Sequence, residues 1–208
     1  MPIATFPLGP LDTNCYVIHR DGQAVVVDPG GDPAAILQFL QDNHLALSAI
    51  LLTHLHFDHL YGVSALHNAT QAPVLAPVGD EQLLHTEAGG GGIWGFPKVP
   101  SFAYAPLEDG EHRFGALQCT VMRTPGHTPG SLSFYFPEEQ AVFTGDLLFY
   151  RSVGRTDFPG GDHAALLNSI RDSIFTLPGA TKVYPGHGSC TSVEDEQHNN
   201  PYCGAFAR

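Results

Sequence analysis

The segment Thr53-His-Leu-His-Phe-Asp-His59 decides how the rest of this 208-residue sequence is interpreted. It follows the apolar run Ala49–Leu52, and an apolar run that ends in polar residues is typical of a buried strand leading into a loop. Four of its side chains could bind a metal ion: His54, His56, Asp58 and His59. Imidazole nitrogens and carboxylate oxygens suit zinc, iron or manganese without any thiolate. The segment therefore predicts a metal site where a strand ends.

The spacing within this segment predicts two metal positions. Residues two apart in an extended chain project to the same side, which places His54 beside His56. Asp58 and His59 come after the chain turns, and we expect them to face a second position. A single histidine is more often a surface or core residue than a ligand, and a chain with 12 histidines has some close pairs by chance. Three histidines and an aspartate in this register are a much more specific signal.

Three more candidate ligands, His127, Asp146 and His187, each follow a predicted strand and a glycine. Glycine allows a close approach of the backbone and dihedral angles that other residues avoid, and a packed group of ligands requires both. Each turn taken alone is explained equally well as a structural turn. Together with the first segment they make five histidines and two aspartates, a number that suits two ions.

Composition and charge limit the function further. With 43% hydrophobic residues, 23 Gly and 17 Pro, the sequence is that of a globular protein rich in loops, which favours an enzyme. A net charge of −12 with only nine Lys and Arg opposes binding to nucleic acid or to anionic membranes. The N-terminus has no basic, apolar leader and no apolar run reaches 18 residues, so we expect a cytoplasmic protein. The four scattered cysteines are expected to be reduced thiols.

Short apolar runs and helical stripes predict a mixed α/β fold. The predicted strands are Tyr16–Ile18, Ala24–Val27, Ala49–Leu52, Val74–Ala76, Cys119–Met122, Leu132–Phe136, Ala141–Thr144 and Lys182–Tyr184. One helix is predicted after Asp32-Pro33, one from Asp162 to Leu177, and one after His59. Strands come in groups with helices between them, which predicts one domain, residues 1–208, of two sheets covered by helices.

The stretch from Gly89 to Pro97 is predicted to be a flexible loop that carries Trp94, the only tryptophan of the chain. It is either a lid over the site or a surface loop whose indole fills a gap in the core.

The order of the candidate ligands resembles the metallo-β-lactamase fold superfamily, and the resemblance covers nearly the whole chain. Within that superfamily, the run Asp146–Pro159 and the Asn200-Pro-Tyr tail are similar to glyoxalase II-like thioester hydrolases. The resemblance implies an αββα sandwich with two mixed β-sheets flanked by helices. It also implies two metal positions bridged by Asp146: one held by His54, His56 and His127, the other by Asp58, His59 and His187.

Some positions depart from the glyoxalase II pattern. Arg155 lies where that group carries a basic residue for the glutathione carboxylate, so it is either a substrate-binding residue or a surface residue. The tyrosine expected two residues later is Asp157. Only 21 residues follow His187, so the chain resembles the compact single-domain branch rather than proteins with an added helical domain. Asp146 stands where broad-spectrum zinc β-lactamases carry a cysteine, and lactamase activity is not expected.

These features predict a metal-dependent hydrolase that cleaves a thioester, S-lactoylglutathione or a related hydroxyacyl thioester. The expected cofactor is two divalent metal ions, with zinc favoured over iron or manganese, and a metal-bound hydroxide is the expected nucleophile. Asp58 and Asp146 are the candidate catalytic residues. Asp28, in Val27-Asp-Pro-Gly, is either a turn residue or an acceptor for the N–H of a ligand histidine.

Three other functions are compatible with a cluster of histidines and aspartates. The main alternative is a mononuclear iron persulfide dioxygenase of the same fold, which would use one histidine of the first segment with His127 and Asp146. The acidic charge disfavours a nuclease. A non-catalytic module would saturate its ion, whereas seven ligands for two ions leave positions open. The expected partner is a small-molecule thioester, and a homodimer is compatible with the sequence.

Overall fold

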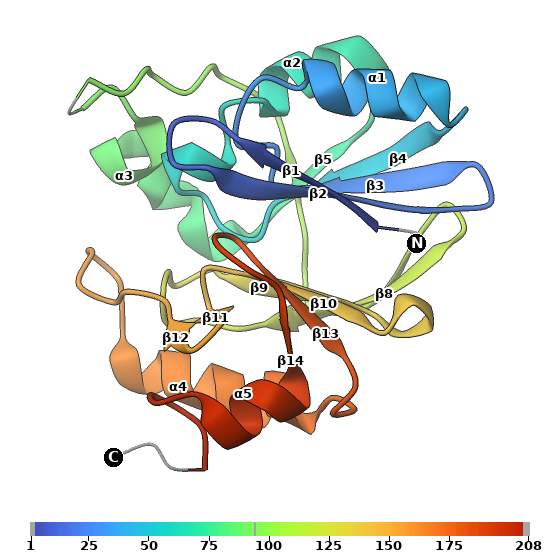
Figure 1. Ribbon diagram of the computed structural model, residues 1–208. Coiled ribbons are helices and arrows are strands. Elements are labelled where there is room, and N and C mark those ends of the chain that lie inside the picture. The colour runs from blue at the N-terminus through green and yellow to red at the C-terminus, as the bar shows by residue number, and fades with distance from the viewer. Residues whose placement is uncertain (1–2, 94, 206–208) are drawn as a thin grey trace.

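The computed structural model describes residues 3–93 and 95–205, and its strands form two six-stranded sheets that pack face to face (Figure 1). The first sheet has its strands in sequence order: β1 (Ile3–Leu8), β2 (Thr13–Arg20), β3 (Gln23–Val27), β4 (Ala46–Leu51), β5 (Val74–Ala76) and β6 (Ala105–Pro106). Strands β1 to β3 pair antiparallel, and β3 to β6 pair parallel. Strands β3 and β4 therefore end at the same edge of this sheet.

The second sheet comes from the later part of the chain. Its strands, in spatial order, are β14 (Thr191–Ser192), β13 (Lys182–Pro185), β10 (Ala141–Gly145), β9 (Leu132–Phe136), β8 (Leu117–Arg123) and β7 (Gly110–Phe114). All neighbours are antiparallel except β10 and β13, which are parallel. Strands β8, β10 and β13 consequently run in one direction and end at one edge. A separate hairpin follows β10: β11 (Leu148–Phe149) and β12 (Ser152–Val153).

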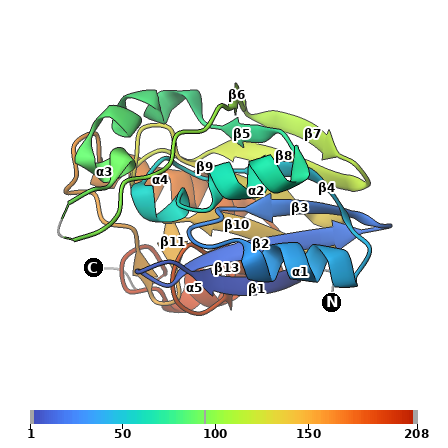
Figure 2. The same ribbon diagram turned by 90° about the horizontal axis from the view of Figure 1, so that it is seen from above.

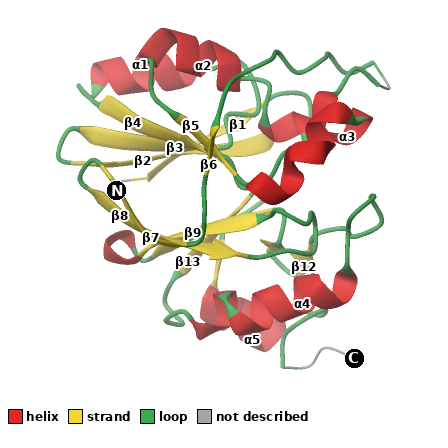
Figure 3. Cartoon of the chain, turned by 180° about the vertical axis from the view of Figure 1, so that it is seen from behind, coloured by secondary structure: helices red, strands yellow, loops and turns green. Residues whose placement is uncertain are grey.

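Helices cover the outer face of each sheet, which completes four layers in the order αββα. Figures 1 and 2 show α1 (Ala34–Asp42) and α2 (Val63–Thr70) over the first sheet. Figure 3 shows α4 (His163–Asp172) and α5 (Val193–Asn199) under the second sheet. The short helices are η1 (Phe57–His59), η2 (Val78–His85), α3 (Glu87–Gly90), η3 (Pro137–Glu139) and η4 (Ile174–Thr176). The predicted fold class is confirmed.

Most predicted elements are present, with two corrections. The helix predicted to reach Leu177 ends at Asp172 and continues only as the 3-10 helix η4. Pro178 explains why η4 does not continue past Thr176, because a residue that precedes proline avoids the helical conformation, and Leu177 is extended with ψ 158°. The glycine-rich stretch is not all loop, because Gly89 and Gly90 end helix α3. Trp94, on which the lid hypothesis partly depends, lies outside the described residues.

None of the helices within the described ranges is long and apolar enough to cross a membrane. The four cysteines are free thiols, as predicted.

The apolar core between the sheets is centred on aromatic side chains. Phe143 on β10 is fully buried and lies 5.1 Å from the ring of Tyr16 and 5.0 Å from the ring of Tyr184, measured between centroids. Tyr16 belongs to the first sheet and Tyr184 to the second. This aromatic group therefore holds the two sheets together next to the edge where β10 and β13 end.

We expect Phe143→Ala to destabilise the protein by about 3–5 kcal/mol, because it removes a buried aromatic ring and leaves a cavity between the sheets. Chemical denaturation of the variant measures this loss. Val78→Ala is the control, since Val78 is 55% exposed and should change stability by less than about 0.5 kcal/mol. Equal effects of the two substitutions would contradict this description of the core.

Candidate metal centre

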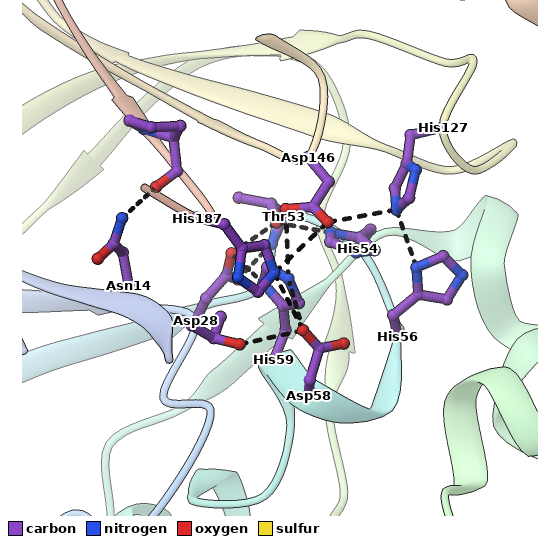
Figure 4. Close-up of polar contacts among 12 residues, drawn as sticks. Asn14, Asp28, Thr53, His54, His56, Asp58, His59, His127, Asp146 and His187 are labelled. Carbon is purple, nitrogen blue, oxygen red and sulfur yellow. Dashed lines mark hydrogen bonds and ion pairs between the residues drawn. The ribbon is translucent and has the colours of Figure 1, made fainter. Parts of the chain in front are cut away.

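All seven predicted ligands lie together where the two sheets meet (Figure 4). The loop after β4 supplies the ligands of the first segment, and the loops after β8, β10 and β13 supply the other three: His127, Asp146 and His187. Gly145 allows this approach, because it has φ +50° and an added side chain would collide with Thr53 of the opposite sheet. Gly186 also allows a close approach, because an added Cβ atom would collide with the side chains of Asp146 and His59.

The first set of ligands consists of His54, His56 and His127, whose nitrogen atoms all lie within 4.8 Å of one another. The Nδ1 atom of His56 is 2.9 Å from Nε2 of His127. All three side chains are at least 95% buried. Three imidazoles that converge in this way suit a zinc or iron ion.

The second set consists of Asp58, His59 and His187, which also offer one atom each within 4.8 Å of one another. Oδ2 of Asp58 is 3.1 Å from Nε2 of His187 and 3.6 Å from Nε2 of His59. The hydroxyl of Thr13 donates to the same Asp58 oxygen at 3.0 Å, which fixes the carboxylate.

Asp146 lies between the two sets. Its Oδ2 is 3.6 Å from Nε2 of His127 in the first set and 3.7 Å from Nε2 of His187 in the second. Its Oδ1 is 3.5 Å from Nε2 of His59. Figure 4 shows the carboxylate pointing between the two groups of imidazoles. The arrangement fits a dinuclear metal site with one shared carboxylate.

Hydrogen bonds outside the centre determine which nitrogen faces it in four of the five ligand histidines, all except His56. Nδ1 of His59 lies 2.9 Å from Asp28, Nδ1 of His127 lies 2.8 Å from the carbonyl of Arg155, and Nδ1 of His187 lies 3.2 Å from the carbonyl of Leu11. These acceptors require a proton on Nδ1, which leaves a free lone pair on Nε2 toward the centre.

His54 follows the same rule through Thr53. The Thr53 hydroxyl donates its proton to Asp28 at 2.6 Å, so its oxygen can accept only from Nδ1–H of His54, at 3.0 Å. Nε2 of His54 and Nε2 of His59 are buried, as is Oδ1 of Asp146, and none has a hydrogen-bond partner in the described part of the chain. Buried polar atoms without partners are costly unless they bind an ion, so the residues present fit a metal centre.

Asp28 belongs to the layer behind the ligands. Its carboxylate accepts from the Thr53 backbone N–H at 2.8 Å as well as from the Thr53 hydroxyl and from His59. Both hypotheses for Asp28 hold, because the residue also adopts a left-handed turn conformation with φ +49°. His54, His59 and Asp28 could form a third ligand set, but the Asp28 oxygens are already occupied by these three donors.

Asp80 plays the corresponding part for the first set, and sequence analysis missed it. This residue of η2 is 1% exposed and accepts from the backbone N–H of Leu55 at 3.2 Å, between His54 and His56. It also accepts from the Thr128 hydroxyl at 2.7 Å and from the Gly130 N–H at 2.6 Å, beside His127. One carboxylate thus joins two ligand loops from opposite sheets. A single aspartate in a polar stretch carries no signal that could have revealed this.

The two sets differ in their electrostatics. Burial, together with the neighbouring imidazoles, lowers the pKa of His54 well below its usual value and that of His56 to about 3. Burial opposes the charge of His59 too, but the carboxylates of Asp58 and Asp28 outweigh it and raise the pKa of His59 well above its usual value. The pKa of His187 is raised by Asp58 against a similar burial effect.

A cavity of about 790 Å³ opens onto the centre, a volume suited to a small-molecule substrate. The ligands that reach it are His56, Asp58, His127, Asp146 and His187. Its walls are largely apolar and include Phe57, Ile93, Phe96 and Phe158. Arg155 lines it as well, so the predicted substrate-binding residue lies at the cavity. Its guanidinium is paired with Asp157.

The family model of the metallo-β-lactamase superfamily matches residues 8–187. The chain belongs to this superfamily. A Bacillus subtilis relative, the probable metallo-hydrolase YqgX, is 37% identical and covers 97% of each chain. The hydroxyacylglutathione hydrolase GloC of Haemophilus influenzae is 30% identical, over 97% of this chain and 98% of GloC. These relatives support a metal-dependent hydrolase.

Solved structures of this superfamily share the fold closely. The B3 metallo-β-lactamase BLEG-1 superimposes with a TM-score of 0.90 at 38% identity, over 97% of this chain and 99% of that one. The protein TTHA1623, in a di-iron-bound form, superimposes with a TM-score of 0.85 at 41% identity, over 96% of this chain and 99% of that one. ETHE1 from Myxococcus xanthus superimposes with a TM-score of 0.80 at 33% identity, over 98% of this chain and 84% of that one. The superfamily prediction is therefore confirmed.

We expect Asp28→Asn and Asp80→Asn to weaken metal binding at different sets. Asp28→Asn disturbs the orientation of His59 and should cost about 10–100-fold in affinity at the second set. Asp80→Asn turns an NH2 group toward a backbone donor and should weaken the first set. Stepwise metal titration of metal-free protein separates the two, and each variant is the control for the other. Identical effects on both binding steps would contradict these assignments.

We expect acidification to release metal from the second set before the first. The raised pKa values of His59 and His187 mean that these imidazoles take up protons above the usual pH 6.5, and a metal ion must displace those protons. His54 and His56 have lowered pKa values and stay neutral over the same range. Metal content after dialysis at pH 8, 7, 6 and 5 should fall in two steps. Simultaneous loss of all metal would contradict this order.

Proposed function

We propose that this protein is a metal-dependent hydrolase that cleaves hydroxyacyl thioesters, with S-lactoylglutathione as the first substrate to test. The observation that carries the proposal is the position of Asp146 between two complete ligand sets at the base of an open cavity. Two divalent ions held there would activate water at neutral pH and attract the carbonyl oxygen of the substrate. The hydroxyacylglutathione hydrolase activity named for GloC supports this class of substrate.

The chain's own residues orient the reactants in this proposal. Asp58 is fixed by Thr13 and faces the cavity, so its carboxylate is placed to orient the attacking water. The Arg155 carbonyl fixes the His127 ring. Apolar walls at Phe57, Phe96 and Phe158 exclude other water from the substrate. Water adds to the carbonyl carbon, the C–S bond breaks, and a carboxylic acid and a thiol leave.

The leaving group explains why the site can work without a strong general acid. A thiol has a pKa near 8.5, so a thiolate departs with little help from a proton donor. The pKa of Asp146 is held well below its usual value by His59 and His127 even though burial acts in the opposite direction, so it stays a carboxylate.

Two other activities have specific support. His56, His127 and Asp146 lie on one side of the cavity, and two histidines with one carboxylate can hold a single iron ion for an oxygenase. A persulfide dioxygenase is therefore the alternative function, and the di-iron-bound TTHA1623 shows that a similar protein accepts iron. The similarity to BLEG-1 makes a β-lactam the second substrate class to assay.

We expect His56→Ala and Asp146→Asn each to reduce kcat for S-lactoylglutathione by at least about 100-fold while the protein stays folded, because each removes a group at the reacting centre. His163→Ala and Asp109→Asn are the matched controls, since both residues are exposed, and they should keep full activity. Thioester cleavage is followed by thiol release, and folding by circular dichroism.

Parallel assays distinguish the alternatives. Oxygen consumption with glutathione persulfide, without thioester cleavage, would replace the hydrolase proposal with the dioxygenase. Cleavage of a β-lactam but of no thioester would replace it with a lactamase. Equal thioester cleavage by metal-free and metal-loaded protein would overturn the metal dependence.

A further inference from the structure

The surroundings of Arg155 bear on which thiol carrier the cavity accepts. We infer that Asp157 binds and neutralises the guanidinium of Arg155. The cavity therefore favours thioesters of a neutral thiol carrier over thioesters of a carrier that has carboxylates, such as glutathione. This inference takes its reaction from the proposed function and deepens it, but it concerns binding and can be tested without turnover.

The cavity offers few positive groups to an anionic carrier. Among the described residues that line it, Arg155 is the only lysine or arginine, whereas Glu87 lines the same cavity as an exposed carboxylate. The whole chain has a net charge of −12. Apart from the metal centre, which the scissile thioester itself would occupy, Arg155 is the one permanently charged cation that this lining offers to a carrier carboxylate, beside the imidazole of His85.

Arg155 already has a carboxylate partner. Its Nε and Nη2 atoms donate to Oδ1 and Oδ2 of Asp157, each at 2.7 Å. This is the two-pronged geometry in which a guanidinium binds a carboxylate best, and it uses one full edge of the group. The Arg155 hydrogen bond lowers the pKa of Asp157 to about 2, so Asp157 is ionised at neutral pH and the pair is neutral as a unit.

The neutral pair is held close to the metal centre. The Arg155 carbonyl accepts from His127, and the guanidinium lies 4.0 Å from the centroid of the Phe158 ring. Phe158 in turn meets the ring of His56 edge-on at 5.6 Å. The pair is therefore attached to the aromatic wall of the cavity, which Arg155 and Phe158 both line. A carrier that makes apolar contacts and neutral hydrogen bonds fits this wall without separating Arg155 from Asp157.

Asp157 takes the Nε and Nη2 edge of Arg155 and cancels its charge, so a second carboxylate is left with the Nη1 edge of a guanidinium that is already neutralised. The two side chains are 57% and 67% exposed, and exposed ion pairs contribute little, so removing the Asp157 charge should improve the binding of an anionic ligand by about two- to fivefold. The effect should shrink as salt is raised, because exposed charges are screened.

Calorimetric binding of two non-hydrolysable ligands tests the inference on protein purified with its metal. The ligands are N-acetyl-S-hexylglutathione and its dimethyl ester, which share the alkyl group, carry no ammonium group and differ only in the two carboxylates. The wild-type protein should bind the diester at least as tightly as the acid. Asp157→Asn should raise the affinity for the acid two- to fivefold and leave the affinity for the diester unchanged. The double variant with Arg155→Ala and Asp157→Asn should lose this gain in affinity for the acid.

A control variant separates local from general charge effects. Asp109→Asn makes the same charge change next to β7, a strand that contributes no residue to the cavity. It should leave both affinities unchanged. Tighter acid binding in Asp109→Asn equal to that in Asp157→Asn would overturn the inference, as would a wild-type preference for the acid of about twofold or more.

A turnover assay distinguishes failure of this inference from failure of the proposed function. S-lactoyl-N-acetylcysteamine has a neutral carrier and the same acyl group as S-lactoylglutathione, and it should have the lower KM with the wild-type protein. A clearly lower KM for S-lactoylglutathione would overturn the inference and leave the hydrolase intact. Cleavage of neither thioester would overturn the hydrolase, while the binding pattern would still decide the inference.

Discussion

The Leu132 backbone N–H of the second sheet donates to the Thr53 carbonyl of the first sheet at 2.8 Å, one residue before His54. On the other side of the centre, Asn14 and Tyr16 of β2 donate to the Pro185 carbonyl at 3.1 and 2.6 Å. These bonds fix how the edges of the two sheets lie against each other. Since each sheet supplies only part of both ligand sets, neither metal position exists unless this registration holds.

The alignment of the two sheet edges brings charged side chains into the interior. There the carboxylates and imidazoles stabilise one another's charges. The carboxylates of Asp58 and Asp146 face imidazoles that hold their pKa values low, and the same carboxylates raise the pKa of His59. Asp28 and Asp80 each accept three hydrogen bonds from the ligand loops or their neighbours. The result is a rigid cluster with lone pairs directed inward, which suits metal binding and leaves the cavity side open to a substrate.

The sequence was sufficient for whatever depends on local spacing. The segment Thr53–His59 and the glycine before each later ligand predicted the cluster, and strands such as Leu132–Phe136 match the structure residue for residue. Contacts between distant segments could not be predicted in this way: Asp80 is one aspartate among several until folding places it between two loops. The pairing of Arg155 with Asp157 was likewise hidden, because sequence proximity does not say whether two side chains meet or face apart.

The central claim is that two metal ions per chain, held by these seven ligands, make the protein a thioester hydrolase. The most direct test is to titrate metal-free protein with zinc and to measure bound metal and S-lactoylglutathione cleavage in the same samples. The account predicts saturation at two ions per chain, with full activity only when the second ion binds. Saturation at one ion per chain, or activity that is complete before any second ion binds, would contradict it.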